Sequence, residues 1–291
     1  MPSLIDIRRR IRSVKNTQQI TKAMKMISAA RLRRAQERMF AARPYAAALR
    51  EVLASIAARV DAATHPLLQA REEEKNVLFV VVTGDRGLCG AFNTNVLRQT
   101  QYAITDRGTA GSAVSLIPIG RKANDFFRRR PTPIRRAGIQ VVDALSLEVA
   151  REIADGMIQA YINGEIDAVY VVHNEFKSVI SQVVRVSRLL PIERVEQREQ
   201  DAAAPAVDYL YEPAPEQILS ELLPKYVEFQ LYRILLESAA AEQGARMTAM
   251  ESASKNASDM ISSLTLTYNR IRQASITKEI IEIVSGAAAA G

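Results

Sequence analysis

The sequence predicts an α/β protein: a long antiparallel two-helix coiled coil from the N- and C-terminal segments, plus a central Rossmann-like, mostly parallel α/β domain. Apolar residues near both ends of the chain recur at steps of three and four, which is the heptad pattern of paired helices. Between the ends, short apolar runs rich in β-branched residues alternate with helical stretches, as in a doubly wound sheet.

The N-terminal segment, residues 1–60, is predicted to be one helix. It has no glycine, and its only prolines are Pro2 and Pro44, the second of which should kink the helix or be tolerated at a bend. The predicted seam follows Ala35, Met39, Ala42, Ala46, Leu49, Leu53, Ile56 and Val60. The earlier residues Leu4, Ile7, Ile11 and Val14 keep the spacing, and we expect them to follow another phase, with an interruption at Gln18, Gln19 and Thr21.

The C-terminal segment, residues 213–291, repeats the pattern. Its predicted seam follows Ala257, Ile261, Leu264, Tyr268, Ile271 and Ser275. From Glu216 to Ser285 the only interior breakers are Pro224 and Gly244, and Gly286 stands where we expect the helix to end. Such a helix would be on the order of 100 Å long, against about 85 Å for the first and about 40 Å for a compact domain of this size. The two helices therefore need each other or an external sleeve.

The central segment, residues 61–192, is predicted to be the α/β domain. Strands are expected at 76–83, 114–119 and 166–173, with an antiparallel edge strand at 179–189. Helices are expected at 93–106, 121–130 and 146–163. Residues 193–212 form a predicted linker or foot segment, because the stretch is charged and then rich in alanine and proline.

The charge distribution indicates an acidic partner for the first segment. The chain has a net charge of +7, yet residues 1–60 alone hold 14 Lys and Arg against only three acidic residues. Such an excess fits an acidic protein groove, a nucleic acid or an anionic membrane. We favour the acidic protein, because the segment lacks the interleaved aromatic residues of single-strand binders. A basic coiled-coil nucleic-acid-binding protein remains an alternative.

Signals for catalysis are weak, and no cofactor or metal is predicted. The turn Gly84–Gly90 (GDRGLCG) follows the first strand and could be a tight turn or a phosphate cradle, but its spacing matches neither dinucleotide nor P-loop motifs. A nucleotide-using α/β enzyme is therefore a second alternative. The single cysteine, Cys89, is expected to be a buried filler, and His173 beside Glu175 lacks a third catalytic group. No apolar run is long enough to span a membrane, so we expect a cytosolic or peripheral protein.

Particular strings add a resemblance to a known family. They are SVKNTQQITKAMKMI (13–27), GDRGLCG (84–90), NEFKS (174–178), DYLYEP (208–213), EQGARMTAM (242–250) and LTLTYNRIRQASITKEIIEIVSGAAA (264–289). In this order they closely resemble the γ subunit of F-type ATP synthases. The terminal string and MTAMESASKNASDMI are similar to the mitochondrial and α-proteobacterial branch.

The resemblance implies a non-catalytic rotor, the central stalk of the F1 sector of a proton-transporting ATP synthase. One copy would pass through the α3β3 hexamer, while the α/β foot sits on the c-ring with the ε subunit. Rotation of the c-ring by protons would then change the conformation of the catalytic β subunits. No nucleic acid is implied as a partner, and the complex would hold the chain peripherally at the cytoplasmic face of the inner membrane.

The matching motifs also imply partner contacts for individual residues. Those expected to contact β subunits are Met24, Lys25, Arg246, Arg272, Gln273, Thr277 and Glu279. The basic residues near Met24 and Lys25 would meet the acidic lever of β. Tyr209 and Glu212 are expected at the foot facing the c-ring, and the outer surface of the sheet would hold ε. The tip SGAAAAG (285–291) would turn in an apolar bearing.

Overall fold

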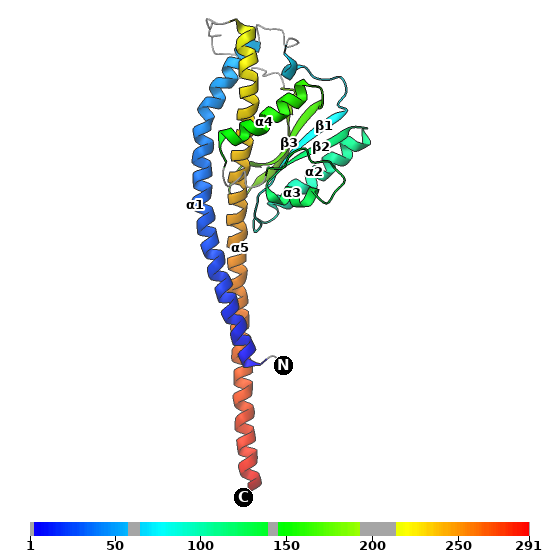
Figure 1. Ribbon diagram of the computed structural model, residues 1–291. Coiled ribbons are helices and arrows are strands. Elements are labelled where there is room, and N and C mark those ends of the chain that lie inside the picture. Colours follow the sequence, from blue (N-terminus) through cyan, green and yellow to red (C-terminus); the bar gives the residue numbers. More distant parts are fainter. Residues whose placement is uncertain (1–2, 58–64, 139–144, 193–213, 291) are drawn as a thin grey trace. The chain divides into compact units, whose positions relative to one another are not determined.

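The computed structural model describes residues 3–57, 65–138, 145–192 and 214–290 (Figure 1). The chain divides into two compact units, each of which is described by itself. One combines Met1–Ala29 with Arg246–Gly291, and the other is Ala30–Ala245. The division falls inside both terminal helices, whereas the segment limits at residues 60, 192 and 212 were drawn from changes in sequence pattern and stay a prediction.

Two long helices open and close the chain, as the sequence predicts. Helix α1 is Leu4–Ala57 and continues through Pro44, and helix α5 is Pro215–Ala290 and continues through Pro224. The expected helix end at Gly286 is wrong, because α5 continues to Ala290. A glycine inside a helix costs only about 1 kcal/mol relative to alanine, so a single glycine does not have to end one.

In the first unit the two helices are antiparallel. Arg8 donates to the hydroxyl of Tyr268 at 2.7 Å, and Lys25 forms an ion pair with Glu251 at 2.7 Å. A step of 17 residues forward along α1 therefore matches a step of 17 residues back along α5. Both helices use one face for the contact, since Ile7 and Ala257 are buried while their neighbours are exposed. The predicted antiparallel pairing is confirmed.

The seam of α1 keeps one phase from end to end, which corrects the expected interruption. Gln18, Thr21, Lys25 and Ser28 continue the steps of three and four that link Val14 to Leu32, and all four are partly or fully buried. Ser28 is 1% exposed and Thr21 is 8% exposed. Thr21 satisfies its hydroxyl by donating to the carbonyl of Gln18 at 3.0 Å. Polar side chains hide the heptad from a search for apolar residues, although the helix face itself is unbroken.

The second unit contains a four-stranded sheet in the order β2-β1-β3-β4. The strands are β1 (Asn76–Val82), β2 (Ala113–Ile119), β3 (Ala168–Phe176) and β4 (Gln182–Leu190). Strand β1 is parallel to both neighbours, with Phe79 opposite Leu116 on one side and Tyr170 on the other. Strand β4 is the antiparallel edge strand. The mostly parallel sheet with one antiparallel edge is therefore confirmed.

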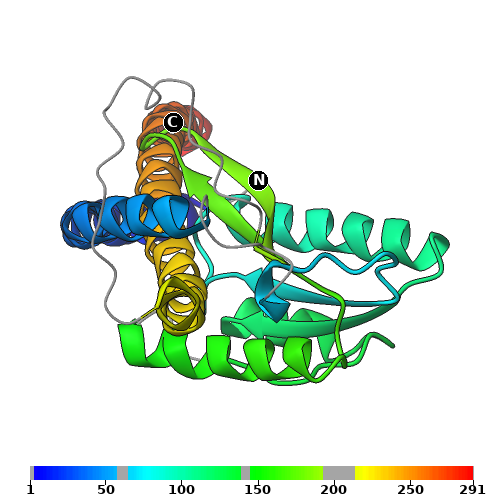
Figure 2. The same ribbon diagram turned by 90° about the horizontal axis from the view of Figure 1, so that it is seen from above.

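Helices cover both faces of this sheet, with α4 on the side opposite α2 (Figure 2). Their bounds are α2 Phe92–Thr109, α3 Arg121–Phe127 and α4 Leu147–Ile162, and a short 3-10 helix, η2, covers Pro66–Leu68. Alternate residues of β1 enter different cores: Phe79 packs with α2 and α3, and Val80 packs with α4. Both faces being covered explains why β1 is apolar at consecutive positions.

Parts of the long helices belong to the core on the α4 side. Leu53 and Ile56 of α1 are buried in the same cluster as Leu223 and Val227 of α5. The ring of Tyr45 lies 4.8 Å from the ring of Phe229, centroid to centroid. The heptad positions predicted from Ala46 to Ile56 are thus confirmed as core, and in this unit they pack on α5 and the sheet layer together.

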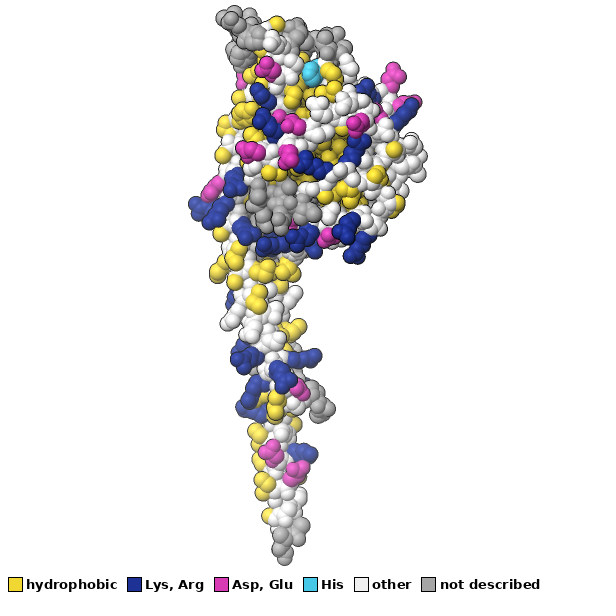
Figure 3. Space-filling view, viewed as in Figure 1, with side chains coloured by type: hydrophobic (Ala, Val, Ile, Leu, Met, Phe, Trp, Pro, Cys, Tyr) yellow, Lys and Arg dark blue, Asp and Glu magenta, His cyan; other side chains and the backbone are white. Residues whose placement is uncertain are grey.

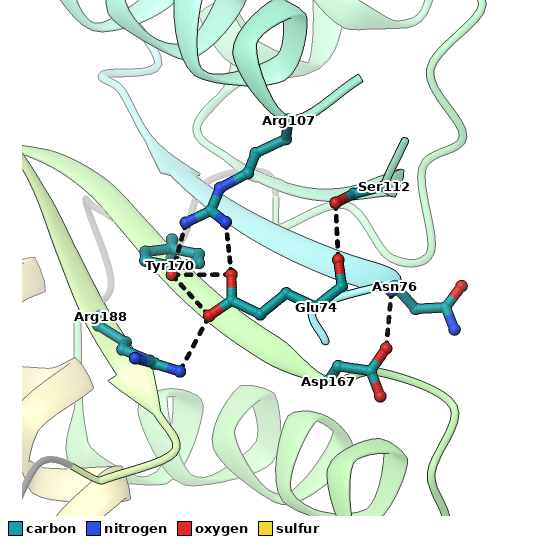
Figure 4. A network of polar contacts seen from close by, with 7 residues as sticks. All are labelled: Glu74, Asn76, Arg107, Ser112, Asp167, Tyr170 and Arg188. Atoms are coloured by element: carbon teal, nitrogen blue, oxygen red, sulfur yellow. Dashed lines mark hydrogen bonds and ion pairs between the residues drawn. The ribbon is translucent and has the colours of Figure 1, made fainter. Parts of the chain in front are cut away.

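A half-buried network of charged side chains connects the strands at the end of the sheet where β1 begins (Figure 4). The carboxylate of Glu74, 16% exposed, pairs with Arg107 at 2.6 Å and with Arg188 at 2.9 Å. It also accepts the hydroxyl of Tyr170 at 3.0 Å. Burial, together with the hydrogen bond to Glu74, raises the pKa of Tyr170 above its usual value. Every charge in the network has a partner, so the arrangement fastens α2, β3 and β4 to the segment before β1.

Candidate partner-binding surfaces

The end of α5 extends past the start of α1 within the first unit. Because Arg8 is level with Tyr268 and α1 begins at Leu4, the residues of α5 after about Gln273 have no α1 beside them. This free end nevertheless exposes hydrophobic side chains, which Figure 3 shows in yellow among charged ones. The exposed hydrophobic side chains are Ile276, Ile280, Ile281, Ile283 and Val284, each 46–71% exposed. A lone helix with such a surface requires a partner to cover it.

Four of the predicted β-contact residues lie on or next to this free end. Arg272, Gln273, Thr277 and Glu279 are all exposed. Thr277 donates its hydroxyl to the carbonyl of Gln273 at 2.9 Å, and Glu279 accepts from Ser275 at 3.3 Å. These are local contacts within one helix, so the charged and amide groups of Arg272 and Gln273 face outward.

The other three predicted contact residues are less accessible. Met24 is partly buried, and Lys25 is a seam residue whose charge is matched by Glu251. Arg246 is only 8% exposed. Tyr209 and Glu212, predicted to face the c-ring, lie outside the described residues. The sequence motifs thus select two kinds of residue. Some are exposed at the free end of α5, and the others are buried or already in contact with other residues of the chain.

A basic groove lies in the second unit, between α1 and α5. Arg31, Arg34 and Arg38 are spaced by three and four residues and line one side of a cavity of about 340 Å³. Its remaining lining is Ala35, Leu145, Leu236, Ala239 and Gln243. Within the described ranges no acidic side chain forms an ion pair with these three arginines. The groove is therefore the described part of the basic segment that best fits an acidic partner.

The turn Gly84–Gly90 lies at the position where a doubly wound fold would bind a nucleotide, beyond the carboxyl end of β1 and beside β3. Here α5 fills that position. A Cβ built on Gly84 would lie 2.6 Å from Oε1 of Glu242, which is itself 5% exposed. A buried carboxylate repels phosphate, so this crevice is unsuited to a nucleotide. The turn is therefore a surface on which α5 packs.

Cys89 and His173 are buried, and the structure gives neither a catalytic arrangement. Cys89 is 1% exposed and its sulfur accepts from the side-chain amide of Asn93 at 3.2 Å. Burial is the largest cause that lowers the pKa of His173 to about 4, so its ring is neutral at pH 7. Glu175 forms its ion pair with Arg185, at 2.8 Å, rather than with His173. No group of three or more potential ligands for a metal ion occurs in the part of the chain that the structure describes.

Three features could not be found from the sequence alone. The isoleucines at the end of α5 are visible in the sequence, but only the structure shows that no α1 lies beside them. The Glu74 network and the contact between Glu242 and Gly84 join groups that are distant along the chain, and no local pattern marks them.

None of the described helices is long and apolar enough to cross a membrane.

Comparison with known proteins identifies the family. The family model described as ATP synthase matches residues 3–290. The ATP synthase gamma chain of Solibacter usitatus is 56% identical over 294 residues, covering 100% of both chains. That of Chlorobaculum tepidum is 50% identical over 290 residues, covering 99% of this chain and 98% of the relative. The chain belongs to the ATP synthase gamma chain family.

Solved structures of ATP synthases agree with the gamma-chain assignment. A chain in the central stalk and c-ring structure of the Tetrahymena thermophila mitochondrial ATP synthase is 27% identical, with a TM-score of 0.61, covering 81% of this chain and 99% of that one. A chain in an Euglena gracilis mitochondrial ATP synthase structure has 21% identity and a TM-score of 0.69, covering 98% and 94%, and shows the fold alone. The expected likeness of this gamma chain to the mitochondrial and α-proteobacterial branch is not supported by relatives from Solibacter and Chlorobaculum.

Membership of the gamma chain family decides between the functions left open by the sequence. The gamma chain is a non-catalytic subunit of the F1 sector, a peripheral part of a membrane-associated complex. A nucleotide-using enzyme is not favoured, and the carboxylate of Glu242 in the crevice agrees with this result. A nucleic-acid-binding coiled coil is not favoured either, because the match covers the whole chain.

Proposed function

We propose that this chain is the rotor shaft of an F1 sector, turning inside a ring of three α and three β subunits. The observation that carries the proposal is the free end of α5, a single helix that exposes five large apolar side chains. Such a helix is stable in water only when something covers it. A ring of surrounding subunits would cover it on all sides without stopping its rotation.

The shaft would act on the β subunits through unequal contacts. Two helices of different sequence have no threefold symmetry, so three identical β subunits around them meet three different surfaces. A rotor changes the affinity of a site only when it contacts the alternative conformations of that site with different energies. Rotation by the c-ring would therefore place each β subunit in turn in a different state.

Individual contacts follow from the exposed groups. Arg272, Gln273, Thr277 and Glu279 are proposed to contact β where α5 enters the ring. Arg31, Arg34 and Arg38 are proposed to meet the acidic lever of β, together with Met24 and Lys25. The ion pair of Lys25 with Glu251 means that Lys25 must exchange partners to reach β. Arg246 is buried and would need a local rearrangement to do so.

The α/β domain is proposed to be the foot of the rotor. Tyr209 and Glu212 would face the c-ring, and the outer surface of the sheet would hold ε. The complex would sit on the cytoplasmic face of the inner membrane. These assignments rest on the family motifs quoted above and on β4, the last strand of the sheet, whose outer edge pairs with no further strand of the described sheet.

Co-purification tests this function. A tag on this chain should recover α and β in a ratio of three each per copy, together with ε and the c-ring. The matched variant replaces Ile276, Ile280 and Ile283 by aspartate. This change should abolish recovery of the ring of α and β subunits while leaving ε bound to the α/β domain. Two results would contradict the proposal. One is recovery of this chain only as a homodimer, and the other is recovery of as much α and β with the aspartate variant as with the wild-type chain.

The extreme tip should be dispensable for assembly. We expect a chain that ends at Ser285 to recover α and β as the full chain does, since the removed residues Gly286–Gly291 carry only small side chains or none. Quantitative gel analysis of the purified complex measures this. Failure of the shortened chain to bind the ring would show that the tip forms essential contacts and does not simply turn in a bearing.

A further inference from the structure

We propose that Glu242 is a positioning residue that fixes α5 on the α/β domain, and that the turn Gly84–Gly90 is the receptor for its carboxylate. The turn then resembles a phosphate-binding loop whose anion is supplied by the chain itself. The functional part of this inference, that torque passes through this contact, rests on the proposed rotor function. The structural part does not.

The closeness of the two groups is the first observation. A Cβ placed on Gly84 would lie 2.6 Å from Oε1, 2.7 Å from Cδ and 3.0 Å from Oε2 of Glu242. The whole carboxylate group therefore lies against the backbone at Gly84, and a side chain at this position would have to displace it. Glu242 is 5% exposed, so the turn and its neighbours replace water around the charge.

The turn is built to hold its shape around that carboxylate. The amide of Gly84 donates to Oδ1 of Asn93 at 2.9 Å, and the side-chain amide of Asn93 donates to the carbonyl of Arg86 at 3.2 Å. Leu88 and Gly90 both have left-handed backbones, with φ of 62° and 57°. Left-handed residues in such turns make concavities in which backbone N–H groups converge on anions.

The same stretch of α5 is held from a second side. Ala241 packs with Cys89 and Phe92, next to Phe176 and Ala245. A Cβ on Gly244 would lie 3.3 Å from the ring of Phe176 and 3.5 Å from the carbonyl oxygen of Val179, in the β3–β4 hairpin. Residues 241–245 thus pack between the β1–α2 turn and that hairpin. Glu242 is the charged residue of this stretch.

A charge at this position is not explained by packing alone. Ala241 and Ala245 show that small apolar residues suffice for contact with the domain. Burying a carboxylate is costly unless donors surround it, and the benefit is a single defined geometry. Glu242 therefore sets the rotation and register of α5 on the domain. In a rotor, this is where force from the foot would reach α5.

Chemical rescue tests the receptor on the full chain. Glu242→Ala should lower the midpoint of thermal unfolding by about 5 °C or more, since a buried charge and its contacts are lost. Formate, which supplies a free carboxylate, should restore part of the loss in Glu242→Ala. Formate should not restore stability in Glu242→Gln, because the glutamine side chain still occupies the space beside Gly84. Glu221→Ala, which removes an exposed glutamate of α5 in the same unit, is the matched control and should not respond to formate.

The outcomes separate clearly. An equal effect of formate on all four proteins, or an unchanged midpoint in Glu242→Ala, would overturn the proposal. If Glu242→Ala does not fold, refolding with formate against refolding with chloride gives the same answer, because only formate should yield folded protein. Equal yields in both salts would also overturn it.

The assembled complex tests the functional part. Per assembled complex, Glu242→Ala should lower proton-driven ATP synthesis relative to ATP hydrolysis at least about twofold, while Glu221→Ala keeps the wild-type ratio. A merely structural role would reduce the amount of complex and leave the ratio unchanged, which would contradict torque transfer at this point. If the wild-type chain binds no α or β, the proposed rotor function fails, and formate rescue still decides whether the receptor exists.

Discussion

Replacing Gly120 by alanine is expected to destabilise the second unit by roughly 3 kcal/mol or more, or to prevent its folding. Gly120 precedes α3 with φ of 91°, a backbone conformation that L side chains rarely adopt. An added Cβ would also overlap the backbone oxygen of Thr83. That oxygen cannot move aside, because Thr83 donates its amide to the carbonyl of Ile119 at 2.9 Å and directly follows the buried strand β1.

Gly156→Ala is the control for this substitution. Gly156 lies in the exposed part of α4, where a Cβ would meet nothing within 4 Å. Alanine there should stabilise the chain by about 0.5–1 kcal/mol, because it has the higher helix propensity. Denaturant unfolding of both variants measures the two effects. A Gly120→Ala protein as stable as the wild type would mean that the close approach of Gly120 to Thr83 is absent.

Acidification should destabilise the fold through His173. Burial, the largest cause, lowers its pKa from 6.5 to about 4, and the charges of Arg233 and Arg185 act in the same direction, against that of Glu175. Well above pH 6.5 the ring is neutral in both the folded and the unfolded chain, so it has no effect on the pH dependence there. As the pH falls from 6.5 towards 4, only the unfolded chain takes up the proton. The free energy of unfolding should therefore decrease by about 3 kcal/mol over this range from His173 alone.

Urea unfolding at several pH values measures this contribution. His173→Leu should flatten the fall in the free energy of unfolding between pH 6.5 and pH 4, although the carboxylates of the chain will still titrate. His65→Asn is the comparison: His65 caps η2 through Nδ1, and its pKa is lowered by a less complete burial. It should retain most of the fall. An unchanged pH profile in His173→Leu would show that the histidine is protonated in the folded chain.

The architecture was predictable because each element has its own periodicity. Consecutive apolar residues such as those of β1 identify a strand covered on both faces, and the structure buries it completely apart from its first residue. The heptad at Leu49, Leu53 and Ile56 was likewise a reliable sign of a buried helix face. These signals are local, so a single sequence contains them.

Errors arose where burial did not require an apolar side chain. Thr21 and Ser28 occupy seam positions, and Thr21 satisfies its hydroxyl within its own helix, so a polar stretch was mistaken for a break. The sequence predicts a helix end at Gly286, although a long helix can include one glycine, as α5 does. Both errors come from assigning a role to residue type where the surrounding structure decides it.

The candidate site was only partly predictable for a different reason. Of the residues that the motifs select for contact with β, Arg272 and Gln273 are exposed whereas Arg246 is buried, and the contact with β itself stays a prediction. The contact between Gly84 and Glu242 joins positions 158 residues apart, and nothing in either stretch announces the other. Long-range complementarity of this kind requires coordinates.

Direct observation of rotation tests the central claim. The α3β3 ring would be fixed to a surface through its β subunits, with a visible probe attached to this chain in the α/β domain, and ATP would then be added. The account predicts rotation of the probe in one direction in steps of a third of a turn, one for each β subunit. Hydrolysis of ATP by the ring while the probe stays still would contradict it.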